Sequence, residues 1–148
     1  MLVSCATGVP KPAATAGTPQ ISWVLMYGDR DDADREFACQ SGPRPECVVP
    51  ASKPDAPVFS DIHFYFHGAG TETRYEGTIN IGYLRQGAEA HASRINITVK
   101  KDESMTNSSV TGIVASTPAS YTVTISATAT TGASKAQPLR ESIPVVVK

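Results

Sequence analysis

The sequence has no excess of charge of either sign. Its 148 residues carry a formal net charge of −1, and 18% of them are charged. Proteins that bind nucleic acid need a surplus of Lys and Arg to neutralise phosphates, so nucleic acid is excluded as an expected partner. No stretch reaches the roughly 18 consecutive apolar residues of a membrane-spanning helix. The longest apolar runs, such as residues 144–147, have the length of a strand.

Metal ligands and catalytic motifs are also lacking. The three cysteines and three histidines do not have the spacing of a zinc site. The acidic run at residues 29–34 lacks the glycine and the terminal glutamate of an EF-hand calcium loop. Arg30 and Arg35 are expected to compensate its charge within a solvated loop. Because no serine stands in a nucleophile-elbow motif either, we expect no metal, no cofactor and no enzymatic activity.

Residues 6–19 (ATGVPKPAATAGTP) differ in composition from the rest of the chain. They are small residues, threonines and three prolines, with a single charged residue. Such a segment cannot bury enough apolar surface to offset its conformational entropy. We therefore expect residues 1–19 to form a flexible tether and residues 20–148 to form one folded domain.

Apolar and polar residues alternate with a period of two through the folded domain, as in strands that bury one face. In residues 61–67, Ile62, Phe64 and Phe66 oppose Asp61, His63, Tyr65 and His67. In residues 73–83, Gly77 falls on the apolar face, where a bulge or a bend is expected. Strands are expected at 20–26, 36–38, 48–49, 61–67, 73–83, 94–100, 109–115, 121–127 and 142–148. About seven to nine such strands predict an all-β fold, an antiparallel two-sheet sandwich.

Cys39 and Cys47 enclose a segment that is typical of a turn. The seven residues between them contain one glycine and two prolines, and short extended arms flank the segment at 36–38 and 48–49. A hairpin would bring the two thiols together, and an oxidising compartment would close them into a disulfide. The alternative is a reduced cytosolic protein with three free cysteines.

The residues Leu2-Val3-Ser4-Cys5 resemble the lipobox of bacterial lipoproteins. In that family the chain is cut before the cysteine, whose thiol then carries a diacylglyceryl group. The resemblance implies that Cys5 is a lipid anchor, that the basic and apolar parts of the export signal precede this sequence, and that the protein lies in the bacterial cell envelope. It implies an outer-membrane protein on the periplasmic or surface face, held off the bilayer by its tether. The alternative is that these residues are an ordinary N-terminus.

A second resemblance lies near the C-terminus. Residues 121–127 (YTVTISA) and 142–147 (SIPVVV) are similar to the last two strands of immunoglobulin-like and fibronectin type III-like domains. The resemblance implies an immunoglobulin-like sandwich in which Tyr121 is the corner tyrosine. The chain departs from the immunoglobulin pattern because no cysteine stands two residues after Tyr121, and because its one tryptophan, Trp23, lies in the first strand.

The polar face of residues 61–67 is the candidate binding face. Tyr65 lies between His63 and His67, and Arg74 is expected on a neighbouring strand. Aromatic and arginine side chains are frequent binding anchors, so this face could take a sugar or a protein, although cross-strand packing explains the same residues. The Cα atoms of His63 and His67 would lie about 13 Å apart on one strand, too far to hold one metal ion.

Three functional hypotheses from different classes remain. The leading one is a non-enzymatic, lipid-anchored binding or assembly module of the cell envelope, with a protein partner there. The alternative is a carbohydrate-binding accessory domain that uses the Tyr65 face. The third is a hydrolase with a nonclassical site near His63 or His91, which would require a pocket around a titratable group.

Overall fold

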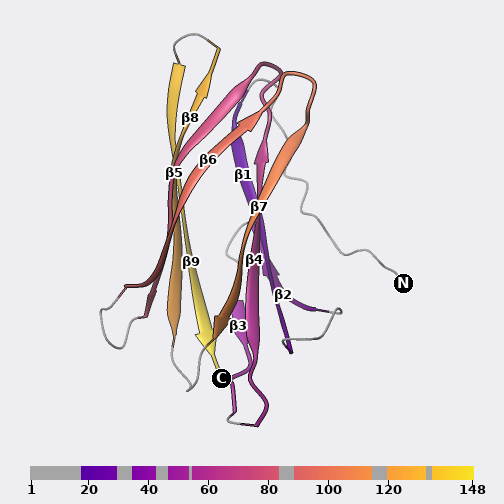
Figure 1. Ribbon diagram of the computed structural model, residues 1–148, viewed down its shortest axis with the longest axis vertical. Helices are drawn as coiled ribbons and strands as arrows, with labels where there is room; N and C mark the ends of the chain where they lie inside the picture. Colours follow the sequence, from indigo (N-terminus) through magenta and orange to yellow (C-terminus); the bar gives the residue numbers. More distant parts are fainter. Residues whose placement is uncertain are drawn as a thin grey trace.

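The computed structural model describes residues 18–29, 35–42, 47–53, 55–83, 89–114, 120–132 and 135–148. Within these ranges the chain is all-β and contains no helix. The strands are β1 (Gln20–Gly28), β2 (Glu36–Gln40), β3 (Cys47–Val49), β4 (Phe59–His67), β5 (Thr73–Tyr83), β6 (Glu89–Val99), β7 (Met105–Val114), β8 (Tyr121–Thr131) and β9 (Lys135–Val147). They form a four-stranded sheet in the order β2-β1-β4-β7 and a five-stranded sheet in the order β3-β9-β8-β5-β6 (Figure 1).

The two sheets pack against each other as a sandwich, as predicted. Both contribute fully buried side chains to one core, among them Trp23 and Leu25 of β1, Phe64 of β4, Ile125 of β8 and Ile143 of β9. The alternation predicted for residues 61–67 is confirmed, because Ile62, Phe64 and Phe66 are buried while His63, Tyr65 and His67 are half-buried.

One strand pairing differs from the prediction. β3 runs parallel to the end of β9, with Cys47 opposite Val145 and Val49 opposite Val147, whereas the other pairs are antiparallel. The chain leaves the four-stranded sheet after β2 and enters the five-stranded sheet at β3. The sandwich therefore departs from the expected antiparallel arrangement at this one described pair, where the chain crosses from one sheet to the other.

Gly77 marks a close approach of two strands instead of the expected bulge. Its pairing is regular on both sides, with Ile95 of β6 and Ala127 of β8. The irregularity in β5 lies between Ile81 and Gly82. A Cβ atom on Gly77 would collide with the carbonyl oxygen of Ser126 and lie 2.7 Å from the Cα atom of Ala127. Gly77 is thus required by the packing of β8 against β5.

Candidate functional site

The predicted disulfide between Cys39 and Cys47 is present, and it joins the two sheets. Cys39 lies in β2, at the edge of the four-stranded sheet, and Cys47 lies in β3, at the edge of the five-stranded sheet. Their Cα atoms are 5.3 Å apart, and both side chains are buried in the core. The predicted hairpin is wrong, because β2 pairs with β1 and β3 pairs with β9. Cys5 lies outside the described residues.

Short edge strands leave part of each sheet uncovered on this side of the sandwich. β2 has 5 residues against 9 in β1, and β3 has 3 residues against 13 in β9. The start of β1 and the first half of β9 therefore flank an open cleft of about 680 Å³. We call it the edge cleft. It is lined by Thr18, Pro19, Gln20, Ile21, Ser22, Gln40, Ser41, Gly42, Gln137, Leu139, Arg140 and Glu141.

The backbone edge of β1 that faces the cleft is partly closed by Ser41. The N–H of Ser41 donates to the carbonyl oxygen of Trp23 at 2.9 Å, and the N–H of Trp23 donates to Oγ of Ser41 at 3.1 Å. Backbone groups alternate between the two edges of a strand, so the N–H and C=O of Ile21 point the same way as those of Trp23. Ile21 thus presents a donor and an acceptor to the cleft.

The edge of β9 that faces the cleft carries two prolines. Lys148 donates its N–H to the carbonyl of Val49 at 3.1 Å and accepts from the N–H of Ala51 at 2.8 Å, so its backbone groups face β3. By the same alternation, Pro138, Arg140 and Pro144 face this edge. The missing N–H groups of both prolines fall here, where they leave the pairing with β8 intact.

The inward side chains at the mouth of the edge cleft are an apolar floor and one carboxyl group. Ile21 and Leu139 are partly buried against the core. Glu141 lies two residues before the buried Ile143, on the core-facing side of β9. Burial raises the pKa of Glu141, and the nearby Trp23 side chain on the facing sheet offsets part of that rise. The side-chain oxygen of Gln20 is buried and has no hydrogen-bond partner among the described residues.

The outer face of β4 holds three of the predicted binding residues. His63, Tyr65 and His67 lie on it together, paired with Val24, Ser22 and Gln20 of β1. Oγ of Ser22 lies 2.8 Å from Nε2 of His67, and burial lowers the pKa of His67. Only 1% of Ser22 is exposed, so its hydroxyl cannot meet a substrate. This pair therefore ties β1 to β4.

Arg74 and Tyr75 do not join this face. Both belong to β5, in the five-stranded sheet. Arg74 is exposed and lies 3.7 Å from the carboxylate of Glu72. Tyr75 is buried, and its hydroxyl contacts the carbonyl oxygens of His67 at 2.5 Å and Gln20 at 3.3 Å. The expected grouping with Arg74 is wrong because the chain changes sheets between β4 and β5. The side chain of His91 lies outside the described residues.

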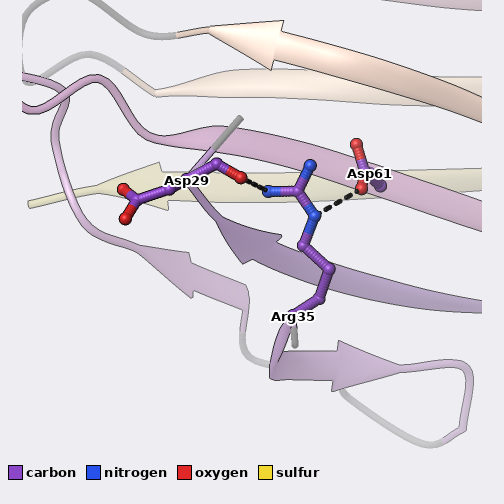
Figure 2. A network of polar contacts seen from close by, with 3 residues as sticks. All are labelled: Asp29, Arg35 and Asp61. Carbon is purple, nitrogen blue, oxygen red and sulfur yellow. Dashed lines mark hydrogen bonds and ion pairs between the residues drawn. The ribbon is translucent and has the colours of Figure 1, made fainter. Parts of the chain in front are cut away.

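Asp29, the first residue of the acidic run, is held in a way that the sequence did not predict. Nε of Arg35 lies 3.1 Å from Oδ2 of Asp61, and Nη1 of Arg35 donates to the backbone carbonyl oxygen of Asp29 at 2.7 Å (Figure 2). Asp61 was expected on a solvated face, yet only 6% of it is exposed. Arg35 therefore compensates a buried carboxylate of β4, while Arg30 and residues 31–34 lie outside the described residues. In the described part, no three His, Cys, Asp or Glu side chains gather as a metal site.

No protein-family model matches the chain, and a comparison with curated proteins gives no match either. Among solved structures, it is similar to a chain described as the crystal structure of the C-terminal domain of wzt. The likeness has a TM-score of 0.44 at 12% identity, and it covers 90% of this chain and 75% of that chain.

Proposed function

We propose that this protein is a non-enzymatic, lipid-anchored binding or assembly module of the bacterial cell envelope. The observation that carries the proposal is the Cys39–Cys47 disulfide between the two sheets. Structural disulfides form and persist in oxidising compartments such as the periplasm and the cell surface, and they are rare in the cytosol. With these two cysteines paired, Cys5 is the one cysteine left for another role, and it stands at the lipidated position of a lipobox-like sequence.

The order of the strands supports an immunoglobulin-like domain as the finer description of the sandwich. In immunoglobulin domains, strand B pairs with E in one sheet, and G, F and C are neighbours in the other. Here β4 pairs with β7, while β9, β8 and β5 are neighbours. In this alignment β8 takes the place of strand F, and Tyr121 is its first residue, where a corner tyrosine stands. The disulfide departs from the B–F pairing of antibody domains, because it joins β2 to β3.

The edge cleft is the candidate site for binding. Small-molecule sites are concave, usually between about 300 and 1,000 Å³, with apolar walls and a few polar groups that orient the ligand. The edge cleft has this size, with Ile21 and Leu139 at its floor and a rim of amide, hydroxyl and charged side chains.

In the described part of the chain, no helix is long and apolar enough to cross a membrane.

The experiment that tests the proposal is fractionation of cells that express the full-length gene in a bacterial host. The parent protein is expected in the membrane fraction, from which detergent extracts it. Cys5→Ser removes the acceptor thiol and should leave the protein soluble or unprocessed. Ser4→Ala is the matched control, since it keeps a small residue before the cysteine and should fractionate like the parent. Equal partitioning of Cys5→Ser and the parent would refute the lipid anchor.

A further inference from the structure

We propose that the edge cleft binds a neutral, polyhydroxylated ligand, a short stretch of glycan. The inference deepens the binding role proposed above and rests on it, and it places carbohydrate recognition in the cleft, away from the Tyr65 face. It is drawn from the lining side chains, their charge balance and the two prolines on the edge of β9.

The rim of the cleft is rich in groups that both donate and accept hydrogen bonds. Gln20, Gln40 and Gln137 line it from three strands, together with Ser41. An amide supplies two donors and an acceptor with two lone pairs, which matches a hydroxyl group that donates and accepts at once.

The charges of the cleft balance, which disfavours an anion as the ligand. Arg140 and Glu141 are its two charged side chains within the described lining, and they have opposite signs. Sites for phosphate or carboxylate groups gather arginines or lysines, often in bidentate geometry. One arginine beside a carboxyl group does not make such a site. The hydroxyl groups of a neutral ligand can bond either kind of side chain, because they both donate and accept.

The two prolines on β9 argue against the other obvious occupant, an added peptide strand. A strand that extends a sheet needs a donor and an acceptor at every second residue of the free edge. On β9 the backbone groups on this edge belong to Pro138, Arg140, Ser142 and Pro144, so a donor is missing at Pro138, on the free part of the edge, and at Pro144, where the pairing with β3 begins. Proline on a free edge is a common protection against unwanted strand pairing. On β1, Trp23 is already bonded to Ser41. The backbone thus offers isolated hydrogen-bonding groups and no ladder.

The test is a titration of the full-length protein, labelled with ¹⁵N and followed by NMR. The probes are three neutral trisaccharides, maltotriose, cellotriose and triacetylchitotriose, each at millimolar concentration. The expected result is that at least one of them shifts the side-chain amide signals of Gln20, Gln40 and Gln137 and the indole N–H signal of Trp23. The side-chain amide signals of Asn96 and Asn107, which are exposed and lie outside the cleft, should stay in place.

A pair of double variants assigns the binding to the cleft. Gln137→Ala with Arg140→Ala should weaken binding of the active trisaccharide about tenfold or more, because two hydrogen-bonding side chains are lost. Asn96→Ala with Arg94→Ala likewise removes one amide and one guanidinium side chain, here from β6, and should leave the dissociation constant unchanged. All four side chains are exposed, so both variants should fold, which thermal melts check.

Two further probes cover the competing ligands. An uncharged threonine-rich decapeptide that shifts the cleft signals when the trisaccharides do not would overturn the inference in favour of strand addition. If sodium sulfate shifts the cleft signals and the trisaccharides do not, the inference is overturned in favour of an anion site. It is also overturned if no trisaccharide shifts these signals. These measurements do not involve Cys5, so they can fail while the membrane fractionation succeeds, and the reverse also holds.

Discussion

Gly77→Ala tests the packing of the five-stranded sheet through a single added methyl group. The new Cβ would collide with the carbonyl oxygen of Ser126 and lie 2.7 Å from the Cα atom of Ala127, both in the backbone of β8. β8 cannot move away easily, because it is paired along its full length with β5 on one side and β9 on the other. Overpacking usually costs about 1 to 3 kcal/mol, and a collision with backbone should reach the upper end of that range.

Gly82→Ala is the matched control because it adds the same methyl group to the same strand. Nothing lies within 4 Å of the Cβ position at Gly82, and its backbone does not need glycine. The control should therefore be neutral or slightly stabilising. A loss of about 3 kcal/mol corresponds to a fall in melting temperature of roughly 6 to 12 °C for a domain of this size. Thermal melts of both variants decide the matter: a Gly77→Ala protein that melts with the control would refute the close approach of β8.

Three further perturbations test other parts of the structure. Phe64→Ala should cost about 3 to 5 kcal/mol in urea unfolding, and Tyr65→Ala less than half of that, because only the first side chain is fully buried; equal losses would contradict the predicted alternation. Glu141→Gln should raise the free energy of unfolding at pH 7 but not below about pH 4. The reason is that a carboxyl group whose pKa is raised by folding loses its stabilising contribution as pH rises through the folded pKa. A difference in stability between variant and parent that stays constant from pH 4 to pH 7 would count against a buried Glu141. Replacing Cys39 and Cys47 together by alanine should cost at least about 2.5 kcal/mol of unfolding free energy, and a variant as stable as the oxidised parent would rule out a structural bond.

Most of the fold could be predicted from the sequence because each strand buries one face. The period-two pattern predicts that residues such as Ile62, Phe64 and Phe66 are buried, and this pattern does not depend on distant parts of the chain. The first half of β9 was not predicted because it lacks this pattern. Residues 135–141 include Pro138 and several polar side chains and show no clean alternation. If the alternation that includes Ile143 is extended toward the N-terminus, Glu141 falls on the apolar face. This was the one signal in the sequence that could have pointed to a partly buried Glu141.

The site was less predictable because it depends on how strands of unequal length are arranged. The edge cleft exists because β2 and β3 are shorter than the strands they border, and no local pattern encodes which strand borders which. The pairing of Cys39 with Cys47 was predicted from their spacing, but the same spacing could not tell a hairpin from a link between sheets. Asp61 has the sequence neighbours of an exposed residue, and its buried carboxylate is compensated by Arg35, which lies directly before β2.

The most direct test of the account is peptide mass spectrometry, without reduction, of the native protein extracted from membranes of the organism that makes it. The account predicts an N-terminal peptide that begins at a diacylglyceryl-modified Cys5 and a cross-linked peptide that contains both Cys39 and Cys47. An N-terminal peptide that still carries an unmodified Cys5, together with Cys39 and Cys47 that react with an alkylating reagent before reduction, would contradict it.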